Sequence, residues 1–391
     1  MRLFSKSIVN SGRQTEADFA KAVCLIGMVF VHVFEEIPLY FINGSLEEST
    51  TAYVLVIVLD AIFGAATFMF CMGFGVTFTK KAEDPSYLIR RGIKLLVCGY
   101  IFNIVRLVIP EIIRDLSRHE TETLLTDLLS MFMLLDIFQF AGLALLLLGL
   151  LKKWRLSDRS IAFTALGMSI AGSFVRDFPI ADMLGIEKPV PAIVTTLTTG
   201  LFAGSVFGFD PTLESSPFPL LNWFIFAVAG YLFAKMLRHC ENKKRFYTIA
   251  SCSGGALVIL YMLIAIPNRI GMMSGNINQY YHLTTPEALL CIIASISVFG
   301  MYYGLSNILP KAVSKAAGVV SHNLTYTYVI HWVLLEWSLT VIAILSDYFG
   351  KGSDNVNVPT GQAILFALII LTAALTLAIL YRNHKENKRV K

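Results

Sequence analysis

Long apolar runs, separated by short polar segments, follow one another along the whole chain. A run of about 20 apolar residues is long enough to cross a bilayer as a helix. The pattern predicts an all-α, polytopic integral membrane protein that forms a single transmembrane domain over residues 1–391. We expect about ten spans, at residues 17–40, 53–79, 91–109, 128–151, 160–175, 218–238, 247–266, 287–308, 320–343 and 361–381.

One further stretch, residues 192–209, is apolar but rich in Thr and Gly. It is either another span or a re-entrant segment packed against protein, the only setting in which irregular backbone is tolerated at membrane depth. We favour the re-entrant segment, because it leaves ten spans and places both termini on one side. The extracytoplasmic loop 176–217 that contains it is long, and long ordered loops tend to carry function.

The distribution of Lys and Arg supports the same topology. With both termini cytoplasmic, 25 of the 32 Lys and Arg residues lie inside, including the basic tail 382–391. Such an excess is the positive-inside signal of cytoplasmic loops. A span at 192–209 would instead put the basic loop 238–245 outside. The seven that lie outside are Arg106, Arg114, Arg118, Arg176, Lys188, Arg269 and Lys351.

Composition agrees with a membrane protein and excludes several other classes. Apolar residues make up 55% of the chain and charged residues 15%, with a mean hydropathy of +0.66; soluble domains average roughly 25% charged residues. The six cysteines are widely spaced and include no C-x-x-C pair, so we expect neither a metal site nor a redox site. No nucleic-acid motif is present. The first apolar run is too long for a signal peptide, which predicts a retained first helix.

The first span carries the densest set of ionisable residues: Asp18, Lys21, His32, Glu35 and Glu36. Such residues are costly at membrane depth and indicate function. Lys21 and His32 fall within roughly 20° of the same helix face, about 16 Å apart along the axis. A bond from Glu35 or Glu36 would fix the His32 tautomer and make its other nitrogen a general base. The alternative is a structural histidine with exposed glutamates at the membrane edge.

Two later spans add polar residues to the membrane interior. Asp136 and Gln139 are expected on one face of the helix at 128–151, and His331 falls near the middle of the span at 320–343. Two intramembrane histidines, His32 and His331, on separate helices indicate a polar chamber or a proton path.

A basic cluster lies at the cytoplasmic mouth of the second and third spans. It contains Lys80, Lys81, Arg90, Arg91 and Lys94 within fifteen residues. Such a cluster can bind phosphate groups. Positive-inside topology, or contact with anionic membrane lipid, explains it equally well.

Six motifs in this order resemble the acyltransferase-3 family and the related heparan-α-glucosaminide N-acetyltransferase-like group. The resemblance extends over nearly the whole chain. The motifs are Asp18-Phe-Ala-Lys21 with Val31-His32, Phe70-Cys-Met-Gly73-Phe74, Arg90-Arg91-Gly-Ile-Lys94, Asp136-Ile-Phe-Gln139, Phe218-Pro-Leu-Leu-Asn-Trp223 with Ala229-Gly230-Tyr231, and Leu324-Thr-Tyr-Thr-Tyr328-Val-Ile-His331-Trp332.

The chain departs from these patterns at three places. Lys21 replaces the usual Arg, which removes bidentate geometry, and Asn222 replaces a Pro. The luminal catalytic histidine of the glucosaminide-transferring enzymes would fall near Asn43, where no His occurs. The absence of this histidine favours acyltransferase-3-like chemistry at His32 over a specific action on glucosamine.

The resemblance implies transfer of an acyl group, with acetyl expected, from cytoplasmic acyl-CoA to a carbohydrate or glycolipid acceptor at the outer face of the cell membrane. It implies acyl-CoA as co-substrate and no bound cofactor. His32 would act as general base or transient acyl carrier, and His331 would complete the chamber. The donor would be held by Asp18, Lys21, Arg90, Arg91 and Lys94. The alternative is a secondary transporter with a proton relay through His32, Asp136 and His331, although no two-half repeat is visible.

Overall fold

The computed structural model describes residues 3–36, 64–79, 81, 83–118, 124–175, 218–273, 281–348 and 360–390. Within these ranges every regular element is helical, and one isolated bridge joins Phe4 to Cys240. The elements are α1 (Thr15–Glu36), α4 (Ala65–Thr77), α5 (Pro85–Asn103), the π-helix η2 (Ile104–Val108), α6 (Ile109–Arg118), α7 (Leu124–Met133), α8 (Ile137–Lys153), α9 (Asp158–Val175), α12 (Leu220–Arg238), α13 (Lys243–Asn268), the 3₁₀ helix η4 (Gly271–Met273), α15 (Thr285–Ile308), α16 (Lys311–Tyr348) and α17 (Thr360–Val390).

In the described part of the chain, seven helical segments are long and apolar enough to cross a membrane. They are α1, α5 continued through η2 and α6, α12, α13, α15, α16 and α17. The all-α, multi-pass class is therefore confirmed. The loop 176–217, with its segment 192–209, lies outside the described residues, as does most of the first half of the span expected at 53–79. The count of ten spans stays a prediction.

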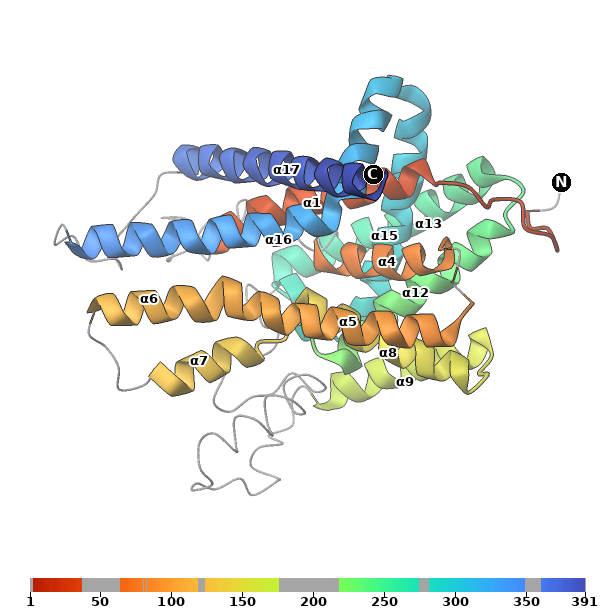
Figure 1. The fold of residues 1–391 in the computed structure, drawn as a ribbon. Helices are drawn as coiled ribbons and strands as arrows, with labels where there is room; N and C mark the ends of the chain where they lie inside the picture. Colours follow the sequence, from red (N-terminus) through yellow and green to blue (C-terminus); the bar gives the residue numbers. More distant parts are fainter. Residues whose placement is uncertain are drawn as a thin grey trace.

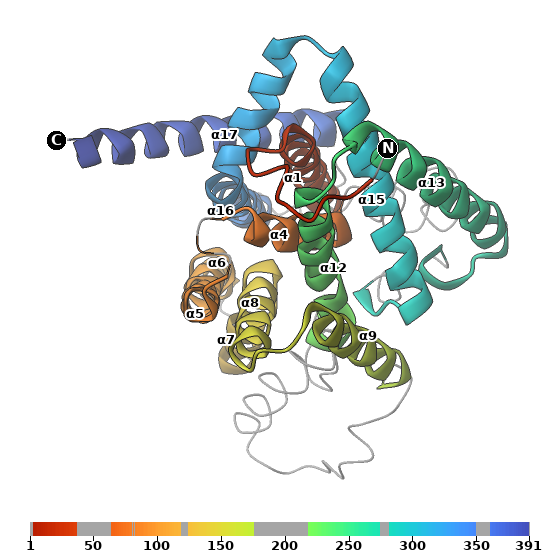
Figure 2. The ribbon, with the colours of Figure 1, turned by 90° about the vertical axis from the view of Figure 1, so that its right-hand side faces the viewer.

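The helices form a bundle in which α1, α4 and α12 are central. Viewed end-on, α5 and α8 lie to one side of these three, α9 lies beside α12, and α13 with α15 lies on another side (Figure 2). The helices α16 and α17 pack against the remaining side of α1 (Figure 1). One side of α1 therefore faces α16 and α17.

The span expected at 128–151 is wrong as one continuous helix. The chain forms α7 and α8 instead, with residues 134–136 non-helical between them. Asp136 is the N-cap of α8: its carboxylate accepts the Ile137 N–H at 2.6 Å, and Gln139 Oε1 accepts the Asp136 N–H at 3.3 Å. Capping groups of this kind compete with the helix for backbone donors, so they start a new helix here.

Close backbone contact joins α4 to α12. A Cβ atom at Gly73 would overlap the Ala227 carbonyl, and one at Gly230 would overlap the Phe70 carbonyl. Small residues allow such an approach, which is a common basis of helix packing in membranes. Gly73 of the F-x-x-G-F motif therefore acts in helix packing.

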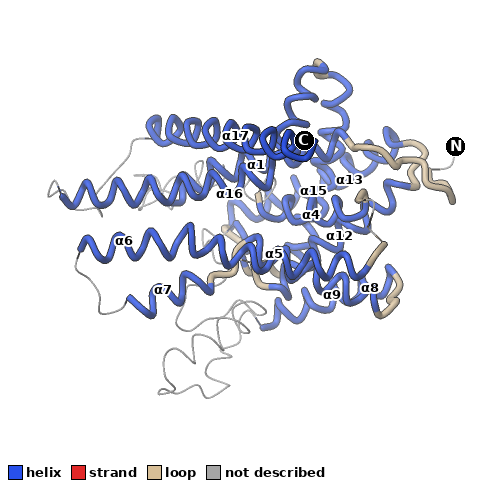
Figure 3. Tube along the Cα trace, in the orientation of Figure 1, coloured by secondary structure: helices blue, strands red, loops and turns tan. Residues whose placement is uncertain are grey.

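The two ends of the described chain lie at the same end of α16. Arg13, ahead of α1, donates from Nη2 to the Gly318 carbonyl at 3.1 Å, and Arg382 of α17 donates from Nη1 to the His322 carbonyl at 2.6 Å. Residues 3–10 run across the turn between α12 and α13, where Asn10 Nδ2 donates to the Leu237 carbonyl at 2.8 Å. Figure 3 shows loops gathered at this end of the bundle. We predict that this end is cytoplasmic.

Cysteine labelling tests that orientation. After the exposed Cys98 and Cys252 are replaced by Ser, a Ser117→Cys variant at the end of α6 should react with an impermeant maleimide from outside intact cells. A Lys244→Cys variant at the start of α13 should react only after permeabilisation. Labelling of the Lys244 position in intact cells would contradict the orientation and restore a span at 192–209.

Candidate active site

The two histidines singled out in the sequence lie next to each other where α1 packs against α16. The ring centroids of His32 and His331 are 5.7 Å apart, and the ring planes are inclined by 17°. His331 is fully buried and His32 is half-buried. The fold therefore brings two imidazoles, almost 300 residues apart in sequence, into one place inside the bundle.

The tautomer of His331 follows from its own helix. Its Nδ1 lies 3.3 Å from the Thr327 carbonyl oxygen. A carbonyl only accepts hydrogen bonds, so Nδ1 carries the hydrogen and donates it. In the neutral ring Nε2 then has a free lone pair, and this buried nitrogen has no hydrogen-bond partner among the described residues. His331 thus presents a basic nitrogen to the interior.

Trp332 contacts both His32 and a buried cation, Arg106. The indole centroid lies 4.2 Å from the His32 ring centroid and 4.0 Å from the guanidinium carbon of Arg106. The indole is therefore in contact with both the imidazole and the guanidinium. A guanidinium over an indole is a favourable cation–π arrangement, and it fixes the wall against which His32 rests.

Arg106 is held by a buried ion pair. Its Nη1 pairs with Asp136 Oδ2, and the two side chains are 5% and 12% exposed. The Tyr328 hydroxyl also donates to Asp136 Oδ2 at 3.3 Å. The sequence counted Arg106 among the outside cations, a topological assignment that stays a prediction. The structure adds that the arginine is buried in the bundle, where pairing with Asp136 offsets the cost of burying its charge.

A local change of helix type accompanies Arg106. The arginine lies in the π-helix η2, between α5 and α6. Trp337 of α16 donates from Nε1 to the Val105 carbonyl in this turn at 3.0 Å. A π-turn inside an α-helix is rare and occurs frequently at functional sites. Here it lies on the helix that supplies the guanidinium to the histidine pair.

A buried carboxylate, Glu336, lies one to two turns beyond His331 on α16 and is 8% exposed. The charges that face it are those of Glu36, Glu111, Arg106 and Arg114. Glu36 at the end of α1 is therefore close to this carboxylate. A bond from Glu36 or Glu35 to His32 stays a prediction, and the side chain of Glu35 lies outside the described residues.

Comparison with known proteins gives the class of chemistry. Residues 15–382 match the acyltransferase-3 model, which describes an acyltransferase domain. The chain belongs to the acyltransferase-3 family. No curated protein and no solved structure matches it. The match covers nearly the whole chain, so the protein is a membrane acyltransferase. Its likeness to the glucosaminide acetyltransferase group stays a prediction from the motifs.

The other charged residues of α1 lie toward the opposite end of this acyltransferase. Asp18 is bound by the Arg13 guanidinium and by the Ser321 hydroxyl, which donates to Oδ1 at 2.8 Å. Lys21 faces α4, where a Cβ atom at Gly75 would lie 3.8 Å from Nζ. Eleven residues of helix, about 16 Å, separate Lys21 from His32. Asp18 therefore ties α1 to α16, whereas the Lys21 ammonium lies beside a glycine.

Three members of the basic cluster, Arg90, Arg91 and Lys94, lie on the first three turns of α5. Lys81 precedes this helix, and Lys80 lies outside the described residues. Arg90 and Lys94 are exposed and Arg91 is half-buried, and Arg90 Nε donates to the Ser86 carbonyl at 3.3 Å. The helix α5 packs mainly against α8, whereas α1 packs against α4, α15, α16 and α17. The fold thus puts these cations and Lys21 on different helices of the bundle. Nearby, a hydrogen bond from Lys152 lowers the pKa of the Glu83 carboxyl below its ordinary value.

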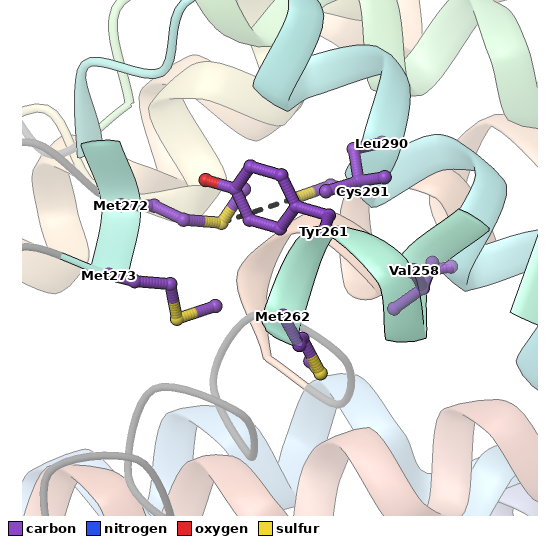
Figure 4. A pocket seen from close by; sticks show the side chains of 8 residues that line it. Val258, Tyr261, Met262, Met272, Met273, Leu290 and Cys291 are labelled. Atoms are coloured by element: carbon purple, nitrogen blue, oxygen red, sulfur yellow. Dashed lines mark hydrogen bonds between the residues drawn. The ribbon is translucent and has the colours of Figure 1, made fainter. Parts of the chain in front are cut away.

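A small apolar cavity lies between α13, η4 and α15, away from the histidine pair (Figure 4). Its lining includes Tyr261, Met262 and Met273, and the Cys291 thiol lies 3.9 Å from the Met272 sulfur. It contains no charged side chain and so lacks the groups that would bind a phosphate. No group of three or more His, Cys, Asp or Glu that could hold a metal ion occurs in the described ranges.

Sequence reasoning missed two members of the histidine site, Arg106 and Glu336. Both had a signal in the sequence, because each is an ionisable residue within a long apolar run. Their partners could not be read in the same way. Arg106 pairs with a residue 30 positions later, and Glu336 faces charges from three other helical segments.

Proposed function

We propose that this acyltransferase moves an acyl group, acetyl in the first instance, from cytoplasmic acyl-CoA to a hydroxyl of a carbohydrate or glycolipid at the outer face of the cell membrane. The observation that carries the proposal is the pair of adjacent imidazoles, half-buried His32 and buried His331, in a family of membrane acyltransferases. Acyl transfer to a hydroxyl requires a base, and neutral histidine is the side chain best suited to that task near neutral pH.

In the proposed reaction His32 removes the proton from the acceptor hydroxyl as its oxygen attacks the thioester carbonyl. A C–O bond forms, the C–S bond breaks, and the proton passes from His32 to the departing CoA sulfur. His331 lies 5.7 Å away with its free Nε2 directed into the interior. If His32 instead accepts the acyl group first, the same bonds are made and broken overall, but in two steps. A hydroxylamine-sensitive acyl-enzyme would then accumulate when no acceptor is present.

The donor is proposed to enter from the end of the bundle at which α1 and α5 begin. Lys21 on α1 and the cations of α5 lie at that end, and CoA carries phosphate groups that such cations bind through charge-assisted hydrogen bonds. The helix length between Lys21 and His32, about 16 Å, separates phosphate binding from chemistry. The pantetheine arm of the donor would cover this distance.

Replacement of Arg90 and Arg91 together by Ala should raise the KM for acyl-CoA with little change in kcat. Each lost contact to a phosphate is worth roughly 1.5–3 kcal/mol, so the KM should rise at least tenfold. Steady-state kinetics in proteoliposomes measure it. Lys244→Ala/Arg245→Ala, which removes two exposed cations from another helix start, is the matched control. An equal KM for acyl-CoA in both double variants would contradict a role in donor binding. Arg90 and Arg91 would then serve only to orient the protein in the membrane.

Inside-out membrane vesicles test the function itself. Radiolabelled acetyl-CoA supplied to vesicles that contain the protein should yield label covalently attached to glycolipid or polymer, identified by mass spectrometry after release with mild base. Vesicles without the protein should not. Vesicles that accumulate label with no covalent product would contradict the proposal and favour the transporter alternative.

A further inference from the structure

The break between α7 and α8 is surrounded by buried polar atoms that have no partner. Asn103 and Gln139 are 4% exposed or less, and so is Arg106. Each has one atom without a hydrogen bond among the described residues: Oδ1 of Asn103, Nε of Arg106 and Nε2 of Gln139. A buried polar group left in this state costs about 1–3 kcal/mol, so three around one short segment call for an explanation.

The same three side chains use their other atoms to build the break. Asn103 Nδ2 donates to the Phe132 carbonyl at 3.1 Å and to the Leu134 carbonyl at 2.8 Å. Arg106 pairs with Asp136, the N-cap of α8, and Gln139 Oε1 accepts the Asp136 N–H. Their directions are therefore fixed at residues 132–136, and the unused atoms are held in the same neighbourhood.

The neighbourhood is arranged around Gln139. A Cβ atom at Gly99 would lie 2.8 Å from its side-chain carbon Cδ, so only glycine leaves room for this amide between α5 and α8. Non-helical backbone at membrane depth is tolerated where it is buried in protein or lines a polar cavity. The break is also close to the histidine pair, because the Tyr328 hydroxyl bonds Asp136 and the Tyr328 ring centroid lies 5.2 Å from that of His331.

We propose that the break between α7 and α8 is a subsite for an amide group of the acyl donor. The two N–H donors, on Arg106 and Gln139, would bind the amide carbonyl oxygen, and Asn103 Oδ1 would accept the amide N–H. Two donors and one acceptor are the complement of a single secondary amide. The inference rests on the proposed function, since acyl-CoA carries such amides in its pantetheine arm, close to the thioester.

Two small acyl donors, one with an amide and one without, test this subsite independently of the chemical step. S-acetyl-N-acetylcysteamine has an amide at the pantetheine position, and S-acetyl-pentanethiol has a chain of similar length without one. The wild-type protein should prefer the amide-containing donor in kcat/KM. In Gln139→Met and in Arg106→Lys, which keeps the charge beside Asp136, the ratio of the two kcat/KM values should fall about tenfold. The ratio is independent of how much of each variant folds.

The matched control is Asn222→Leu. Asn222 is 1% exposed, and, like Asn103, its Nδ2 donates to a backbone carbonyl, that of Leu283 at 2.9 Å, while its Oδ1 is unpartnered within the described residues. Its donor ratio should equal that of the wild type. An unchanged ratio in Gln139→Met and Arg106→Lys would overturn the subsite and leave these atoms to a structural water. Absence of transfer from acetyl-CoA itself by the wild type in the same assay would overturn the proposed function, and with it the occupant assigned to the break.

Discussion

Replacement of His32 by alanine should abolish acyl transfer while the protein still inserts and binds acyl-CoA. General-base catalysis typically contributes about 10²- to 10⁴-fold, and the rate should fall by at least that factor. Donor binding should survive, because the phosphates are proposed to lie about 16 Å away along α1. Initial rates of label transfer measure the loss, and equilibrium binding of labelled acyl-CoA to the purified variant provides the comparison.

His331→Ala is the matched variant on the facing helix. Its effect should be smaller if His331 shapes the chamber beside His32, and a difference between the two pH–rate profiles would show which imidazole titrates in catalysis. A larger loss in His331→Ala than in His32→Ala would move the base to the free Nε2 of His331. Full activity in a well-expressed His32→Ala protein would contradict the mechanism.

Asp136→Leu should strongly destabilise the protein, because it leaves the Arg106 charge buried without its ion-pair partner. Removal of one member of a buried pair typically costs about 3–5 kcal/mol, and loss of the α8 N-cap adds about 1 kcal/mol. Thermal unfolding in detergent, followed by near-ultraviolet circular dichroism, should show a large fall in midpoint temperature. The effect has a clear cause in the structure, since both side chains are nearly inaccessible.

The double variant Arg106→Met/Asp136→Leu tests this cause. Replacement of a buried ion pair by apolar residues of similar size is often neutral or stabilising, so most of the lost stability should return. Activity should not return. The double variant removes the Arg106 N–H proposed to bind the amide carbonyl of the acyl donor, and it removes the guanidinium that packs on Trp332. A double variant as unstable as Asp136→Leu would show that the N-cap, and not the unpaired charge, dominates the stability of this region.

The features that the sequence predicted correctly are those set by the lipid environment and by the composition of each segment alone. Membrane-spanning helices must satisfy their own backbone hydrogen bonds, so apolar runs of sufficient length predicted helices whatever their neighbours. The same reasoning singled out His32 and His331, because an ionisable residue inside such a run is conspicuous. The positional order of short motifs was enough to indicate the acyltransferase-3 family, which the match over residues 15–382 confirmed.

The same method failed where polar side chains changed the backbone. The run at 128–151 is apolar enough for one helix, but Asp136 and Gln139 form a reciprocal cap that starts α8 and leaves residues 134–136 non-helical. A capping box needs a residue outside the helix to contact one inside it, and i,i+3 spacing on a continuous helix looks the same in sequence. The burial of Arg106 beside Asp136 was missed because charge counting carries no information about partners.

What the sequence by itself determined is the all-α membrane class, the positions of most apolar helices and the identity of the two intramembrane histidines. Only the tertiary structure decided that His32 lies beside His331, that Trp332 contacts both His32 and Arg106, and that Arg106 pairs with Asp136 at the break. The physical reason is the range of the forces involved. Burial in lipid acts on each segment independently, whereas hydrogen bonds, ion pairs and ring contacts act over a few ångströms between residues that only packing of α1, α5, α8 and α16 brings together.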